Sequence, residues 1–110
     1  MRQWDDTWPA MRQEAHHGDR VVTCFATRWH SLHAMLVQAV DRNPDGVALV
    51  CDEQRMTYRK LHHASQALAG ALRTHGVDVG DRVALLLGNR IEFVVALFAT
   101  TQIGAISVPL

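Results

Sequence analysis

The sequence has no excess of charge of either sign. Among its 110 residues, eleven lysine and arginine residues balance eleven aspartate and glutamate residues. A surface that binds nucleic acid needs an excess of basic residues, so we expect no nucleic-acid partner. Lysine is nearly absent, because Lys60 is the only one, and no Gly-x-x-x-x-Gly-Lys motif occurs. The lack of that motif excludes the phosphate loop of the nucleotide-binding proteins that carry it.

Cysteine is scarce as well. Cys24 and Cys51 have no partners at the spacing of metal ligands or redox pairs, so both are interpreted as ordinary thiols. The N-terminus carries charge at once and no secretory core follows it. We therefore expect a cytoplasmic protein, in which a disulfide between the two cysteines is not expected.

Histidine is more frequent, with seven residues, but it forms no recognisable metal motif. A metal site needs three or four converging donors, and neither a cysteine pair nor His-Glu-x-x-His accompanies the histidines. We interpret them as solvated side chains, with His75 favourably placed near the end of a helix dipole. They are His16, His17, His30, His33, His62, His63 and His75.

One uncharged run, Phe93 to Leu110, reaches the lower length of a membrane-spanning helix. Polar residues, Gly104 and Pro109 interrupt it. A buried helix followed by a buried strand explains the run more simply, so no membrane span is expected.

The first part of the chain, residues 1–29, shows no steady hydrophobic period and is predicted to be an irregular arm. Trp4 and Trp8 lie among charged residues, residues 16–19 indicate a turn, and Val21 to Thr27 could add one strand.

Regular elements are predicted from Ser31 onward. Ser31 can cap a helix whose apolar residues recur at spacings of three and four, and the helix should end at Asn43-Pro44. A hairpin follows, with strands at 47–51 and 55–57. Thr57 can cap a second helix, which Gly76 ends. The apolar residues of the two helices are Leu32, Met35, Leu36, Ala39, Val40, Leu61, Ala64, Leu68 and Leu72.

The last third predicts a strand, a helix and a second strand. Val83 to Leu87 is a continuous apolar run, as expected where helices cover both faces of a parallel sheet. Asn89 is predicted to cap a helix over 91–103, buried on more than one side, and Ala105 to Leu110 supplies the next strand. Such a unit is normally parallel, so the fold class is α/β. Its two strands would leave an open hydrophobic edge.

Some residues could be taken for functional groups. Asn89 lies where α/β ligands often bind, but a helix cap is the favoured interpretation. Ser31 and Thr57 have no histidine and acid partners at a diagnostic spacing, so they too are interpreted as caps. Trp29, Phe93 and Phe98 are predicted to be core residues rather than a cofactor platform.

The order of these signals resembles the N-terminal start of the adenylate-forming (AMP-binding) superfamily, most closely its acyl-CoA synthetases and fatty-acid–CoA ligases. The resemblance covers about residues 28–110. Met56-Thr57-Tyr58-Arg59-Lys60-Leu61 is similar to the family's first core motif, Leu-Thr-Tyr-x-Glu-Leu, although Lys60 replaces its glutamate. The other blocks are Asn43-Pro44-Asp45, Val47-Ala48-Leu49-Val50, Gly76-Val77, Gly80-Asp81-Arg82-Val83-Ala84, Leu87-Gly88-Asn89, and Gln102-Ile103-Gly104-Ala105 with Val108-Pro109-Leu110.

The resemblance implies an N-terminal fragment of the large domain of such an enzyme. Its elements would be an amphipathic helix, a β-hairpin, a helix and a parallel βαβ unit, with residues 30–110 forming a partial N-terminal subdomain. The family joins a carboxylic acid to ATP and passes the acyl group to a thiol, so it implies ATP, Mg²⁺ and coenzyme A for the full-length protein.

The resemblance also implies where that chemistry lies. In the family, the phosphate loop, the nucleotide contacts and the catalytic lysine follow the second core motif. No catalytic, cofactor-binding or metal residue is therefore assigned in this chain, and a truncated segment that is inactive alone is expected. Two alternatives stay open: a peptide-synthetase adenylation domain, or a non-catalytic α/β module. The expected partners are the remainder of the ligase or a second copy at the exposed sheet edge.

Overall fold

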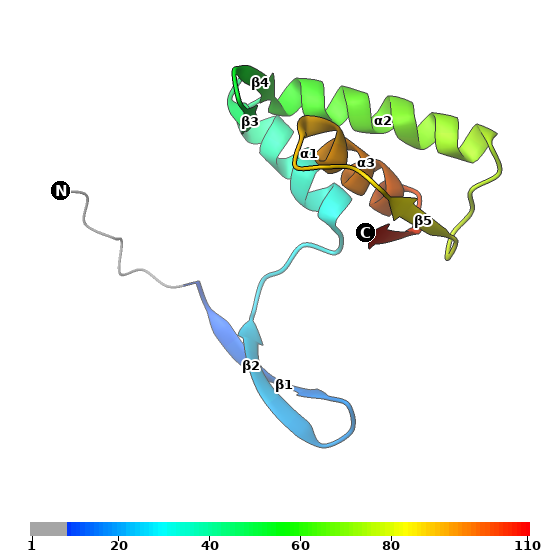
Figure 1. Cartoon of the computed structure of the whole chain (residues 1–110). Helices are drawn as coiled ribbons and strands as arrows, with labels where there is room; N and C mark the ends of the chain where they lie inside the picture. Colours follow the sequence, from blue (N-terminus) through cyan, green and yellow to red (C-terminus); the bar gives the residue numbers. More distant parts are fainter. Residues whose placement is uncertain (1–8) are drawn as a thin grey trace.

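Three helices and three separate strand pairs make up residues 9–110, the part of the chain that this computed structural model describes (Figure 1). The first eight residues, with Trp4 and Trp8, lie outside the described residues. Helices and strands alternate along much of the chain, so the predicted α/β class is confirmed.

An antiparallel hairpin precedes the helices. It is formed by β1 (Met11–His16) and β2 (Arg20–Phe25), and it extends away from the rest of the structure (Figure 1). The predicted turn is confirmed, because His17 and Gly18 adopt positive φ angles of 53° and 88°. The strand considered over Val21 to Thr27 is present as β2, whereas the prediction of an irregular arm is wrong for β1. The apolar side chains of the hairpin follow no clean alternation, and Met11, Val21 and Phe25 are exposed, so hydrophobic periodicity does not reveal the strands.

Helix α1 (Leu32–Arg42) begins at the predicted cap. The side chain of Ser31 accepts a hydrogen bond of 3.0 Å from the main-chain N–H of Ala34. Leu36 is buried, and the helix ends before Pro44 as predicted.

The predicted second hairpin is confirmed as β3 (Val47–Cys51) and β4 (Gln54–Thr57), paired antiparallel with a register shift between Val47 and Leu49. Its tight turn contains no glycine. Asp52 takes the left-handed conformation instead, with φ of 53°, which aspartate tolerates better than most residues.

Helix α2 (Tyr58–Thr74) follows at once. Thr57 accepts a hydrogen bond of 3.2 Å from the N–H of Lys60, as predicted for a cap. At the other end, Gly76 has φ of 91°, and Val77 donates to the carbonyl of Leu72 over 3.0 Å. The N–H of Gly76 likewise donates to the carbonyl of Arg73. This is the Schellman arrangement, in which a left-handed glycine lets two successive N–H groups reach the last helical carbonyls.

The parallel unit consists of β5 (Arg82–Leu85), α3 (Ile91–Gln102) and β6 (Ile106–Pro109). The core lies where α2 and α3 pack together next to the β5–β6 pair. Small side chains let the two helices approach closely. The core residues are Ala69, Ala99, Ile103 and Ala105, with Leu68, Leu72, Val77 and Val83 packed against them.

Two details of the parallel unit differ from prediction. Strand β5 ends at Leu85, and Leu86 is 80% exposed. Along β5 exposed and covered residues alternate, so helices of the described chain cover one face of this pair rather than both. Arg90, not Asn89, is the N-cap of α3, and it makes no side-chain capping bond.

The predicted burial of α3 is confirmed: of its residues only Glu92, in the first turn, is exposed. No helix among residues 9–110 combines the length and apolarity needed to cross a membrane.

Candidate functional site

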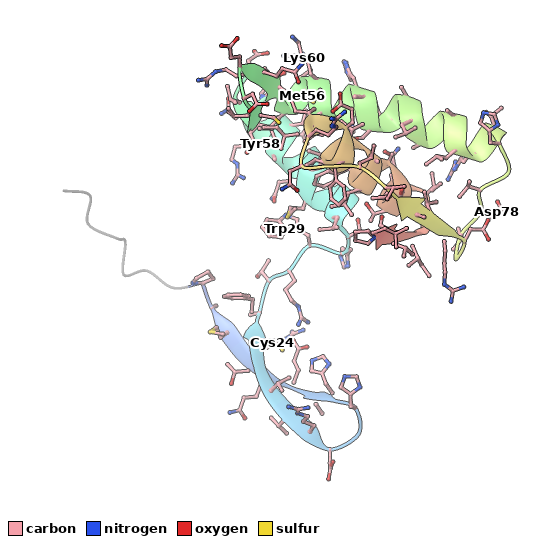
Figure 2. All side chains as sticks on the ribbon, viewed as in Figure 1. Cys24, Trp29, Met56, Tyr58, Lys60 and Asp78 are labelled. Carbon is pink, nitrogen blue, oxygen red and sulfur yellow. The ribbon has the colours of Figure 1, made fainter. Side chains whose placement is uncertain are left out.

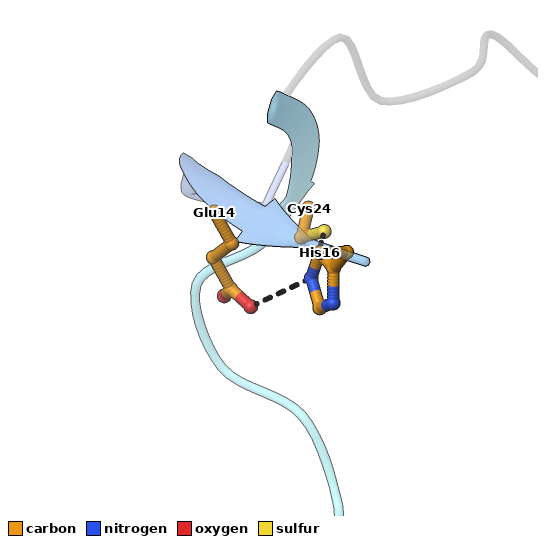
Figure 3. Close-up of side chains that lie close together, drawn as sticks. All are labelled: Glu14, His16 and Cys24. Atoms are coloured by element: carbon orange, nitrogen blue, oxygen red, sulfur yellow. Dashed lines mark hydrogen bonds and ion pairs between the residues drawn. The ribbon is translucent and has the colours of Figure 1, made fainter. Parts of the chain in front are cut away.

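Three potential metal ligands of different chemistry meet on the N-terminal hairpin. Glu14 and His16 come from β1 and Cys24 from β2, and the three side chains lie together in Figure 3. The His16 Nε2 atom lies 3.2 Å from Glu14 Oε1 and 3.6 Å from Cys24 Sγ. All three donor atoms lie within 4.8 Å of one another, and each side chain is partly buried.

Two arginines surround the carboxylate of this cluster. Arg12 Nε donates to Glu14 Oε2 over 2.6 Å, and Arg28 Nη2 donates to both carboxylate oxygens over 2.8 and 2.9 Å. These contacts lower the pKa of Glu14 from 4.5 to about 2; the hydrogen bond from Arg12 has the largest effect and that from Arg28 the next largest. The carboxylate is therefore ionised over the whole physiological range.

Sequence reasoning missed this cluster. Neither His16 nor Cys24 belongs to a ligand motif, so the sequence alone predicts a solvated imidazole and an ordinary thiol. The spacing Glu14-x-His16 places both side chains on one face of a strand, but that signal has meaning only once residues 11–16 are recognised as a strand. Cys24 then joins through the pairing of β1 with β2.

A second candidate region lies between β3 and the start of α3. A cavity of about 250 Å³ there is lined mainly by apolar groups, and the thiol of Cys51 donates to the main-chain oxygen of Asn89 over 3.5 Å. Asn89 thus contributes its carbonyl to this region and does not cap α3. The lining residues are Leu49, Val50, Cys51, Asn89, Arg90, Ile91, Phe93 and Val94.

The remaining histidines do not converge as metal ligands among the described residues. His33 and His62 stack with ring centroids 5.9 Å apart, and His63 lies 6.4 Å from His62. His62 Nδ1 is buried without a hydrogen-bond partner. The pKa of His62 is lowered below its ordinary value, mainly by partial burial and to a smaller extent by the neighbouring His33 and His63. His75 follows the last turn of α2, where its N–H donates to the Ala71 carbonyl.

The aromatic residues divide between core and surface. Phe93 and Phe98 are partly buried in α3, whereas Trp29 is exposed in the segment before α1 (Figure 2). The prediction that Trp29 is a core residue is wrong. Its indole N–H instead donates to the side-chain oxygen of Gln38.

The described residues do not fit a magnesium–nucleotide complex. Lys60 is exposed on the first turn of α2 (Figure 2). The group of three close metal-ligating side chains found among residues 9–110 contains an imidazole and a thiol, whereas Mg²⁺ prefers oxygen ligands in octahedral geometry. No step of nucleotide chemistry follows from these residues.

Comparison with known proteins accounts for the larger part of the chain. The family described as AMP-binding enzyme matches residues 36–110. A medium/long-chain-fatty-acid–CoA/3-oxocholest-4-en-26-oate–CoA ligase of Mycobacterium marinum is 43% identical over 68 residues, which cover 62% of this chain and 12% of the ligase. The chain thus spans about one eighth of the length of this relative.

Solved structures agree with the fold. The N-terminal subdomain of Klebsiella oxytoca NpsA matches with a TM-score of 0.70 and 32% identity, over 73% of this chain and 21% of that chain. NpsA-ThdA, an artificially fused adenylation-PCP di-domain NRPS from the same organism, matches with a TM-score of 0.72 and 30% identity, over 79% and 16% of the two chains.

Proposed function

Because this chain belongs to the family of AMP-binding enzymes, we propose that it supplies the opening scaffold of the N-terminal subdomain of an ATP-dependent carboxylate–CoA ligase. That ligase joins a carboxylic acid to ATP, releases pyrophosphate, and transfers the acyl group from the adenylate to the thiol of coenzyme A. The scaffold role belongs to the predicted subdomain segment, residues 30–110.

The observation that carries this proposal is the two-stranded parallel β5–α3–β6 unit. Helix α3 is covered along nearly its whole surface, but the sheet beside it has only two strands within the described chain. Leu86, Ile106 and Leu110 stay exposed around this sheet. A parallel sheet is normally buried and has more strands, so the unit suits a segment that the rest of a larger subdomain covers.

A coenzyme A ligase is preferred to a peptide-synthetase adenylation domain. The fatty-acid–CoA ligase relative is 43% identical over its matched residues. Among the solved structures, O-succinylbenzoate coenzyme A synthetase of Bacillus subtilis is 37% identical over 68% of this chain, against 30% over 79% for the NRPS di-domain. These values support a fatty or other organic acid as the substrate class of the full enzyme. Measurement of acyl transfer to coenzyme A and to a carrier protein would distinguish the two acceptors.

The proposed compartment is the cytoplasm. Cys24 and Cys51 are both free thiols, which suits a reducing environment.

The test is reconstitution of ATP–pyrophosphate exchange. We propose to mix the 110-residue chain with the M. marinum relative lacking the residues that align with this chain, and to supply medium-chain and long-chain fatty acids. Exchange is expected from the mixture and from neither part alone. Exchange by the 110-residue chain alone would show that it carries its own catalytic machinery.

Matched variants make this test specific. Leu85 is buried in β5 and the adjacent Leu86 is exposed. Leu85→Asp should abolish reconstitution, because a charge buried in β5 disrupts the parallel pair. Leu86→Ala changes an exposed residue, so this chain should keep its fold. A wild-type chain that binds the truncated relative without restoring exchange would contradict the scaffold proposal.

A second candidate function is a non-catalytic module that associates with a partner chain. The observation that favours it is the same exposed apolar surface at Leu86, Ile106 and Leu110, because an open sheet edge can pair with another strand. Analytical ultracentrifugation separates the two functions: concentration-dependent oligomers of the wild-type chain, without reconstituted exchange, would favour the module.

A further inference from the structure

We propose that Glu14, His16 and Cys24 form a zinc-binding site on the N-terminal hairpin. These residues precede the family match at 36–110, so this site goes beyond the proposed ligase scaffold and does not depend on it. The site would provide one carboxylate oxygen, one imidazole nitrogen and one thiolate sulfur, with a water molecule as the fourth ligand. Three protein ligands and one open position are a common zinc arrangement.

The distances between the donor atoms fit one tetrahedral zinc ion. Usual zinc bond lengths imply donor separations of roughly 3.4 Å for an oxygen and a nitrogen, and roughly 3.6 Å for a nitrogen and a sulfur. The corresponding separations are 3.2 Å from Glu14 Oε1 to His16 Nε2 and 3.6 Å from His16 Nε2 to Cys24 Sγ. Small side-chain movements are sufficient to close the remaining Glu14 to Cys24 distance, which is at most 4.8 Å.

The donor types select the metal. Magnesium and calcium prefer oxygen ligands, whereas imidazole and thiolate ligands suit zinc. Binding releases the thiol proton of Cys24 to solvent. His16 coordinates as a neutral ring through Nε2 and keeps its proton on Nδ1. The charges of the carboxylate and the thiolate then balance those of Zn²⁺.

The two arginines affect this site differently, because only Arg28 contacts the carboxylate oxygen that faces His16. Arg12 contacts Glu14 Oε2, which leaves Oε1 beside His16 available to the metal. Arg28 also contacts Oε1 and must withdraw from it. Its side chain is 44% exposed, against 16% for Glu14, so it can move into solvent. Arg28 is therefore a competitor of the metal, which gives the proposal a distinctive test.

Zinc binding would also stabilise the hairpin. An isolated two-stranded hairpin is marginally stable in water, and β1 and β2 pair only with each other among the described strands. A metal held by Glu14 and His16 on one strand and Cys24 on the other would link the strands across the sheet. Binding to the folded hairpin alone shifts its equilibrium toward the paired state.

The first experiment is a zinc titration of the full 110-residue chain against a chromophoric chelator. One equivalent of zinc is expected to bind. Glu14→Gln, His16→Gln and Cys24→Ser should each weaken binding by at least about tenfold, since even the loss of outer-shell partners weakens metal sites by that factor. Cys51→Ser and His17→Gln are matched controls that should bind like the wild type.

A second titration uses Arg28→Gln, which removes the competing guanidinium. This variant should bind zinc several-fold more tightly than the wild type, a direction that misfolding would not produce.

Two further measurements report on the ligands and on the hairpin. With Co²⁺ as the probe, the wild type should show a thiolate-to-cobalt absorption band that Cys24→Ser lacks and Cys51→Ser retains. Hydrogen exchange should slow in residues 11–25 when zinc is added.

Three results would overturn the proposal. The first is zinc affinity that Cys24→Ser leaves unchanged. The second is a cobalt–thiolate band that depends on Cys51. The third is weaker zinc binding by Arg28→Gln although circular dichroism shows the wild-type fold.

Discussion

Gly104 lies against the side chain of Val79, and a Cβ atom at position 104 would come within 3.2 Å of Val79 Cγ2. The carbonyl of Gly104 also accepts a hydrogen bond of 2.9 Å from the N–H of Gly80. This pair of glycines joins the turn before β5 to the turn before β6. The parallel strand pair therefore depends on the conformation of the backbone at Gly104.

Substitution of Gly104 should destabilise the chain. Its φ of +77° favours glycine, so Gly104→Ala should reduce the free energy of unfolding by about 1–2 kcal/mol. Val79 is exposed and can move, so backbone strain is the main cause. Urea denaturation measures the change.

Gly70→Ala is the matched control for this prediction. Gly70 lies inside α2, and a Cβ atom added there would have no other atom within 4 Å. Gly70→Ala should therefore raise the free energy of unfolding by about 0.5–1 kcal/mol. Equal effects at both sites would contradict the strain argument.

The cap at the start of α2 gives a second prediction. Thr57→Ala removes the oxygen that accepts from the N–H of Lys60, and should reduce the free energy of unfolding by about 1 kcal/mol. Thr57→Ser keeps an acceptor and should retain most of the stability. If both variants unfold alike in urea, loss of the cap is not the cause.

Helix α2 packs through Leu61, which is 2% exposed. Leu61→Ala should reduce the free energy of unfolding by about 2–5 kcal/mol, because it removes apolar contacts and leaves a cavity. Leu86→Ala is the control at an exposed position and should change stability by no more than about 0.5 kcal/mol. Thermal denaturation can rank the two variants. A smaller effect at Leu61 than at Leu86 would contradict the packing described here.

The lowered pKa of His62 predicts how acid affects the contact between α1 and α2. Partial burial, His33 and His63 lower this pKa, and Asp41 opposes them. Because the pKa of His62 is lower in the folded chain, the unfolded chain binds more protons as the solution is acidified. The stability that the neutral His62 ring contributes to folding is therefore present above pH 6.5, its ordinary pKa. It is lost as the pH falls through the lowered pKa of the folded state.

The measurement is urea denaturation of the wild type and His62→Gln between pH 7 and pH 5. The variant should lose less stability than the wild type across this range. His30→Gln, at an exposed position before α1, is the matched control and should follow the wild type. An unchanged slope in His62→Gln would show that this ring does not titrate differently on folding.

Local rules predicted most of the fold after residue 30. Ser31 and Thr57 cap helices because their side-chain oxygens reach the main-chain N–H groups three residues later. Gly76 ends α2 because it adopts a positive φ. The parallel pairing of β5 with β6 followed from the length of the connection between them. Each of these signals acts over a few residues or one crossover.

The errors fall where tertiary structure overrides such signals. Asn89 is a good capping residue, and α3 begins at Ile91 as predicted, yet Arg90 occupies the N-cap position. The Asn89 carbonyl accepts instead from Cys51, which is distant in sequence. Leu86 is apolar enough to continue β5, but no partner strand within the described chain covers it. The Glu14, His16 and Cys24 cluster depends on the pairing of β1 with β2, which hydrophobic periodicity does not encode.

The central claim is that residues 9–110 provide scaffold and not the nucleotide-binding part of a ligase. Isothermal titration calorimetry of the 110-residue chain with ATP and Mg²⁺ tests it most directly. The account predicts no saturable heat up to millimolar nucleotide, with or without the metal. Saturable, magnesium-dependent binding of ATP by this chain alone would contradict it.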